Sequence, residues 1–84
     1  MKTEIYASAN LPDGAEITYS LLTAETSGRI GCELYGVEVR MGEETVTRPN
    51  LSASRASVGL LLDKLVRGCV TPVTADDIIE DYYI

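Results

Sequence analysis

The chain has 84 residues, of which 45% are hydrophobic and 24% are charged, and its net charge is −6. This length predicts one domain, residues 1–84, with a thin core, and the composition excludes a disordered chain. The seven basic residues are spread singly along the chain, whereas a phosphate backbone requires clustered Lys and Arg. We therefore expect no nucleic-acid partner, and the negative charge also disfavours an anionic membrane surface.

The N-terminal residues and the cysteines predict a cytoplasmic protein. Met1-Lys2 runs directly into polar Thr3-Glu4 without an apolar signal segment, and no apolar run approaches the roughly 20 residues that span a bilayer. Cys32 and Cys69 lie far apart in the sequence and are expected to be reduced, buried thiols. A disulfide or a reactive thiol is the alternative.

Residues 1–50 have the pattern of strands joined by tight turns. Residues 3–9 alternate and predict a short strand, one face of which is formed by Ile5, Ala7 and Ala9. A turn at residues 10–14, with the sequence Pro-Asp-Gly, separates it from a second strand at residues 15–25. One face of this second strand consists of Ile17, Tyr19 and Leu21.

A third strand is predicted at residues 30–41, after a turn at residues 26–29. Its apolar residues change parity near Gly36: Ile30, Cys32 and Leu34 precede the change, and Tyr35, Val37, Val39 and Met41 follow it. A β-bulge at Gly36 would return the second set to the core face, and this is the interpretation we favour. The alternative is a strand that is covered on both faces.

The fourth predicted strand, residues 44–50, is weakly apolar. Pro49 removes a backbone donor, which places this strand at an edge of the sheet or ends it there. Charge and proline on an edge strand oppose pairing with other chains.

The strongest pattern in the sequence predicts a helix at residues 52–68. Five apolar residues recur at helical spacing and form one stripe: Val58, Leu61, Leu62, Leu65 and Val66. Ser52 or Ser54 is the expected N-cap, and Gly68 is the expected left-handed residue after the C-terminus. Gly59 lies beside the stripe, where the lack of a side chain would allow a strand to approach, and Leu60 is expected to stay partly exposed.

A second, shorter helix is predicted at residues 74–84, after an extended connector at residues 69–73 that contains Pro72. Thr74 is the expected N-cap, with Asp76 and Asp77 in the first turn. The expected apolar face consists of Ile78, Ile79, Tyr82 and Tyr83. So short a helix is unstable alone and must dock on the domain or on a partner.

The sequence lacks most of the residues used in catalysis. It contains no histidine, which removes the commonest general base and the commonest neutral metal ligand. It also contains no phosphate-binding glycine motif and no EF-hand spacing. We therefore predict a protein that is not an enzyme, with no cofactor and no metal site.

The acidic C-terminal segment is the candidate partner-binding site. Its residues are Asp77, Glu80, Asp81, Tyr82 and Tyr83. Tyrosine is enriched at the centres of protein interfaces, whereas Asp and Glu are depleted there. The carboxylates are thus expected to form a solvated helix face or a docking face. The tyrosines are expected either to pack on the domain itself or to anchor a partner chain.

Several short segments resemble a known family. They are Tyr19-Ser20-Leu21, Tyr35-Gly36-Val37, the stretch Leu-Val-Arg-Gly-Cys-Val-Thr-Pro-Val-Thr at residues 65–74, and the stretch Ile-Glu-Asp-Tyr at residues 79–82. In these the chain resembles a small family of bacterial proteins, classed as a domain of unknown function and seen mainly in anaerobic Gram-positive gut bacteria. The resemblance implies a cytoplasmic bacterial protein and brings no activity or ligand with it.

Together these elements predict an α+β domain. Four antiparallel strands form a meander, the main helix packs on one face, and the short C-terminal helix packs at its side. The other sheet face is expected to stay wet or to pair with a second copy. The function predicted from these features is a non-enzymatic protein-binding or regulatory module, whose partner is another protein or a second copy in a homodimer. The alternative is a small-ligand or metal-binding domain.

Overall fold

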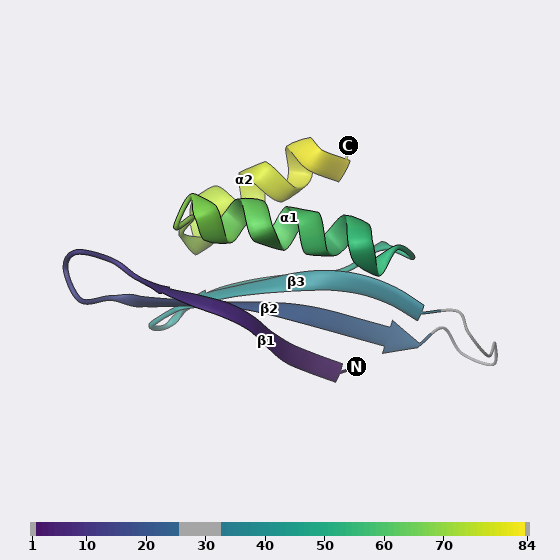
Figure 1. Ribbon diagram of the computed structural model, residues 1–84, viewed down its shortest axis with the longest axis horizontal. Coiled ribbons are helices and arrows are strands. Elements are labelled where there is room, and N and C mark those ends of the chain that lie inside the picture. The colour runs from purple at the N-terminus through teal and green to yellow at the C-terminus, as the bar shows by residue number, and fades with distance from the viewer. Residues whose placement is uncertain (1, 26–32, 84) are drawn as a thin grey trace.

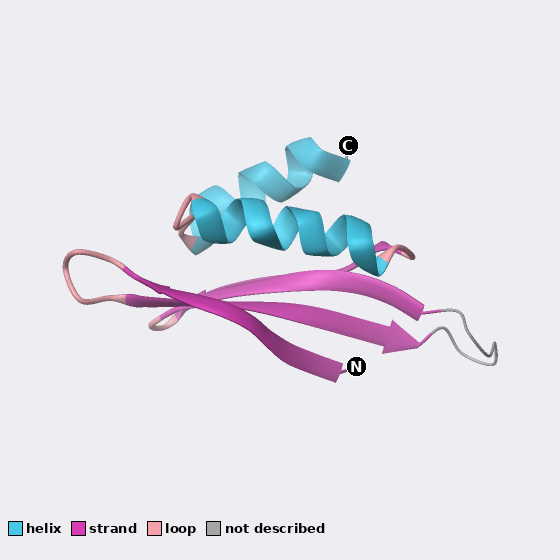
Figure 2. Ribbon diagram, in the orientation of Figure 1, coloured by secondary structure: helices cyan, strands magenta, loops and turns pink. Residues whose placement is uncertain are grey.

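The computed structural model describes residues 2–25 and 33–83 and has the predicted α+β architecture. Its strands form one antiparallel sheet in the order β1-β2-β3-β4, and both helices lie on the same face of that sheet (Figures 1 and 2). The elements are β1 Lys2–Asn10, β2 Glu16–Glu25, β3 Glu33–Met41, β4 Glu44–Ser52, α1 Arg55–Arg67 and α2 Pro72–Tyr83. The predicted meander is confirmed, and the predicted turn at residues 26–29 lies outside the described residues.

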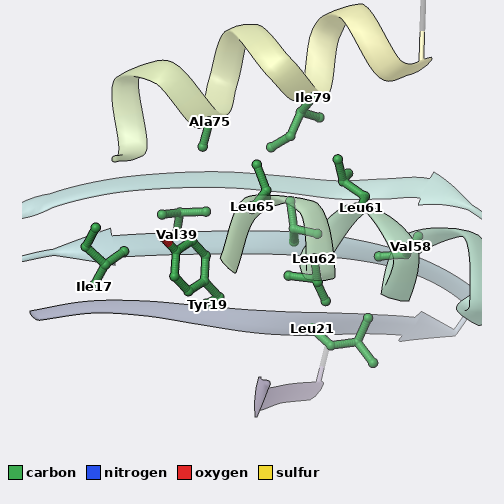
Figure 3. Packing of buried hydrophobic residues seen from close by; sticks show 11 residues of the cluster. Ile17, Tyr19, Leu21, Val39, Val58, Leu61, Leu62, Leu65, Ala75 and Ile79 are labelled. Atoms are coloured by element: carbon green, nitrogen blue, oxygen red, sulfur yellow. The ribbon is translucent and has the colours of Figure 1, made fainter. Parts of the chain in front are cut away.

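The core lies between the sheet and the helices. The predicted stripe of α1 faces the core: Val58, Leu61, Leu62 and Leu65 are fully buried, and Val66 is partly buried and packs against them. The buried side chains pack against Ile17, Tyr19 and Leu21 of β2 and Val39 of β3, as Figure 3 shows. Val37 of β3 belongs to the same cluster. The hydroxyl of buried Tyr19 donates to the carbonyl oxygen of Val70 over 2.9 Å, so the one aromatic side chain among these residues has its polar end satisfied.

Strand β1 contains a bulge that the alternating sequence did not predict. Its pairing with β2 shifts between Ile5 and Ala7, and the extra residue is Tyr6. The prediction that Ile5 shares a face with Ala7 and Ala9 is therefore wrong. Ala9 packs against the core, whereas Ile5 is opposite Ser20 and its side chain is 75% exposed. The Tyr6 hydroxyl reaches the helical layer, where it donates to Asp63 of α1.

The irregularity predicted at Gly36 lies on the neighbouring strand. Pairing of β3 with β2 continues without a shift through Gly36, which is opposite Leu22. The shift lies in β4, where two steps along β3, from Tyr35 to Val37, correspond to four along β4, from Ser52 to Arg48. The prediction of a bulge in the third strand is thus wrong. Ile30 and Cys32, which motivated it, lie outside the described residues.

Helix α1 begins three residues after its predicted start at residue 52 and ends one residue before its predicted end at residue 68. Ser54 is the N-cap, and its side chain accepts from the backbone N–H of Ser57. Gly68 was predicted to be left-handed but has φ −85°, and the residue with positive φ is Cys69, at 47°. The space beside Gly59 is open, since a β-carbon at this position would have no atom within 4 Å, so the predicted close approach of a strand is also wrong.

Helix α2 begins two residues earlier than predicted. Proline at the first helical position loses no intrahelical hydrogen bond and has a helical φ already, so Pro72 starts the helix rather than preceding it. Thr71 takes the place that was predicted for Thr74, and its carbonyl oxygen accepts from the N–H of Ala75. The first turn accordingly contains no acidic residue, contrary to the prediction for Asp76 and Asp77.

Candidate functional site

The C-terminal tyrosines have different environments although they are adjacent. Tyr83 is half-buried and packs against the core, and its hydroxyl lies 3.3 Å from that of Ser57 at the start of α1. Tyr82 remains 42% exposed. The two rings meet edge to face with centroids 5.0 Å apart. Tyr83 is therefore a packing residue that positions the ring of Tyr82 at the surface.

Helix α2 is held to the domain by its buried side. Pro72, Ala75 and Ile79 are buried, and Figure 3 shows Ala75 and Ile79 on the side of α2 that faces the rest of the core. Of the four predicted apolar residues, Ile79 is thus in the core, Ile78 and Tyr83 pack against it, and Tyr82 does not.

One ion pair fixes α2 to the edge strand. Arg48 of β4 donates to Oδ1 of Asp76 from Nε over 2.6 Å, and its Nη2 lies 2.5 Å from the same oxygen. Both side chains are more than a third exposed, so the pair adds little to the free energy of unfolding. The pair joins the side of α2 that carries Asp76 to the edge strand.

The other three carboxylates of α2 point away from the core. Asp77, Glu80 and Asp81 lie outside the buried side of α2, and helical spacing places Asp77 and Asp81 one turn apart. Among residues 2–25 and 33–83, the ion pair between Arg48 and Asp76 is the one that involves α2. The candidate residues therefore divide into an acidic outer face, an exposed Tyr82 and a packed Tyr83.

A shallow hollow lies between the two helices beside Tyr82. Its volume is about 240 Å³, and it is lined by Lys64, Ile78, Asp81 and Tyr82. Ile78 and the ring of Tyr82 supply its apolar surface, and the charged side chains of Lys64 and Asp81 complete its lining. Sequence analysis did not assign Lys64 to the site, because only the antiparallel packing of α1 and α2 brings this residue to α2.

Two more tyrosines donate hydrogen bonds to carboxylates, Tyr6 across to α1 and Tyr35 within β3. Tyr6 donates to Asp63, and this hydrogen bond to the carboxylate raises the pKa of Tyr6. Tyr35 donates to Glu33 over 2.7 Å, which raises its pKa in the same way. In both cases the hydroxyl is a structural donor.

The described part of the chain contains few other groups that could react or bind a metal ion. Cys69, predicted to be buried, is a free and exposed thiol, and Cys32 lies outside the described residues. No group of three or more His, Cys, Asp or Glu side chains in the described residues is placed to hold a metal ion. None of the helices described is long and apolar enough to cross a membrane.

Comparison with known proteins identifies a family. A family model described as a family of unknown function (DUF6514) matches residues 1–84. The chain belongs to this family. No curated protein and no solved structure matches the chain. The resemblance to a domain of unknown function, which was based on the sequence motifs, is thus confirmed. The bacterial origin expected with it stays a prediction.

Proposed function

We propose that this protein is a non-enzymatic module that binds another protein through the outer face of α2. The observation that supports the proposal is the contrast between Tyr83, which is packed, and Tyr82, which is 42% exposed beside a hollow. Exposed tyrosines that are held rigidly are common anchors in protein interfaces, since they offer a large contact area at a low cost in side-chain entropy.

The dimensions of the hollow favour a protein surface over a small-molecule pocket. Sites that enclose drug-sized ligands have volumes of roughly 300–1,000 Å³ and bury most of the ligand. The hollow beside Tyr82 has about 240 Å³ and is lined by four residues. Such a site suits one inserted side chain better than a whole metabolite.

Affinity capture from the source organism tests the proposal. The bait is the full chain in three forms: wild type, Tyr82→Ser and Val73→Ser. Val73 is the matched control, because it is also on α2, is 68% exposed and lies at the other end of the helix. We expect a discrete partner that wild type and Val73→Ser retain equally and that Tyr82→Ser loses about tenfold or more. Equal capture by all three forms contradicts the proposal.

Deletion of the C-terminal segment does not test this function. Ala75 and Ile79 belong to the core, so a chain without α2 is expected to unfold. The homodimer prediction is tested separately by light scattering over a range of concentrations. If the protein is strictly monomeric at the highest concentration, the homodimer prediction is excluded and the proposed partner is a different protein.

A further inference from the structure

The helical layer presents one exposed large hydrophobic residue on α1 and another near the end of α2. Leu60 of α1 is 63% exposed, and Tyr82 of α2 is 42% exposed. Leu60 is one turn before Lys64, which lines the hollow with Tyr82, and one turn after Ser57, which contacts Tyr83. This spacing places Leu60 on the same side of α1 as Ser57 and Lys64, the side that meets α2.

We call Leu60, Lys64, Ile78 and Tyr82 the Leu60–Tyr82 patch: Lys64, Ile78 and Tyr82 line the hollow, and helical spacing places Leu60 beside Lys64 on α1. The two helices run antiparallel here, since the start of α1 meets the end of α2, and Figure 1 shows the same arrangement. Apolar side chains from both helices thus flank a shallow groove on the side away from the sheet. Amphipathic helices bind to grooves of this kind through apolar side chains spaced three and four residues apart.

The charges beside the patch favour one kind of amphipathic helix from a partner protein, a basic one. Asp81 lines the hollow and Asp77 lies one turn before it on α2, whereas Lys64 is the single basic residue of the patch. The whole chain has a net charge of −6, so a basic partner is also favoured during the approach.

We propose that the Leu60–Tyr82 patch binds a basic amphipathic helix of a partner protein. This inference rests on the proposed function and names the partner's chemistry. Apolar side chains of that helix contact Leu60, Ile78 and Tyr82, and its Lys or Arg side chains face Asp77 and Asp81.

A second copy of the chain fits the patch less well. A twofold interface brings the same surface of both copies together, so the acidic face of one α2 would meet that of the other. A stable dimer also buries roughly 800 Å² per partner and some 20–30 residues a side, far more than four residues provide. A short helical segment matches the size and the charge of the patch.

A direct binding measurement with designed peptides tests the inference. The probe is a fluorescent amphipathic peptide of Lys and Leu, about five turns (roughly 18 residues) long. A shuffled peptide of the same composition cannot form an apolar stripe, and an analogue with Glu in place of Lys reverses the charge. We expect the Lys/Leu peptide to bind wild type at about 0.15 M salt, with about tenfold weaker binding of each comparison peptide.

Variants of the full chain locate the binding site. Leu60→Ser and Tyr82→Ser are each expected to weaken peptide binding about tenfold, and Val73→Ser to leave it within about twofold. Lys64→Glu removes the basic residue of the patch and is expected to strengthen binding a few-fold. Circular dichroism verifies that each variant is folded.

Any of three results in the peptide experiment overturns the inference: no binding of the Lys/Leu peptide to wild type, equal binding of the shuffled peptide, or binding that neither Leu60→Ser nor Tyr82→Ser weakens. Self-association of wild type that Leu60→Ser abolishes would assign the patch to a second copy and overturn it as well. Capture of a partner that depends on Tyr82 would still support the proposed function after any of these results, so the two can fail separately.

Discussion

Gly36 of β3 lies directly against the carbonyl group of Arg48 in β4. A β-carbon on Gly36 would also stand 2.6 Å from Cα of Pro49, closer than real β-carbons approach another atom. The glycine is therefore required by the bulge of the neighbouring strand, although its own backbone continues the β2–β3 ladder without a shift. The bulge includes Asn50, whose φ is 58°.

Gly36→Ala is expected to destabilise the protein by about 3 kcal/mol. The added methyl group meets backbone atoms of β4, which cannot move aside as a flexible side chain does. Urea unfolding followed by circular dichroism measures the change. A loss below about 1 kcal/mol would show that the strand relaxes easily and would contradict this account of the bulge.

Gly59→Ala, in contrast, is expected to stabilise the protein. Gly59 lies within α1, and no atom lies within 4 Å of a β-carbon placed on it. Alanine favours the helix over glycine by about 1 kcal/mol, so the free energy of unfolding should rise by up to that amount. The same urea experiment measures it, and a decrease would mean that the space beside α1 is filled.

Tyr19 makes the free energy of unfolding fall as the pH rises in the alkaline range. Burial raises the pKa of Tyr19 from 10.0 to about 12. As the pH rises, the hydroxyl of Tyr19 therefore loses its proton in the unfolded chain before it does so in the folded chain. The contribution of the protonated hydroxyl to the free energy of unfolding is complete below pH 10 and is lost as the pH rises toward 12. The raised pKa values of Tyr6 and Tyr35 act in the same direction.

The variant Tyr19→Phe separates the contribution of this residue. It removes the donor to the Val70 carbonyl oxygen and should cost about 1–2 kcal/mol near neutral pH. Urea unfolding at a series of pH values should then show a shallower loss of stability above pH 10 than in wild type. An unchanged slope would mean that Tyr19 ionises alike in the folded and the unfolded chain.

The ion pair between Arg48 and Asp76 is expected to be weakly stabilising. Its side chains are 38% and 39% exposed, and exposed pairs contribute about 0.2–1 kcal/mol. A double-mutant cycle with Arg48→Met and Asp76→Asn should give a coupling free energy in that range. A coupling above about 2 kcal/mol would show that the pair holds α2 in place more strongly than an exposed pair can.

The features that repeat along the sequence were predictable, and those that depend on a neighbour were not. The stripe of α1 and the core-facing residues of β2 were recognisable because one face of each repeats at its own period. The bulge at Tyr6 was missed, because Ile5 continues the alternation in the sequence while the pairing with β2 places it on the other face. Gly36 marked a real irregularity but could not indicate which strand contained it.

The candidate site was predictable in part for the same reason. The acidic face and the exposed Tyr82 follow from their spacing along one helix. The separate roles of Tyr82 and Tyr83 depend on Ser57, which lies 26 positions from Tyr83 in the sequence and meets it only in the fold. Lys64 joins the site through the same packing of α1 on α2.

Site-specific photo-cross-linking in cells of the source organism shows whether the surface at Tyr82 contacts another protein. A benzophenone amino acid replaces Tyr82 in the full chain, and a second form carries it in place of Val73, which is also exposed on α2. The account predicts one discrete protein adduct from position 82 and none from position 73. No adduct at position 82, or the same adduct from both positions, would contradict it.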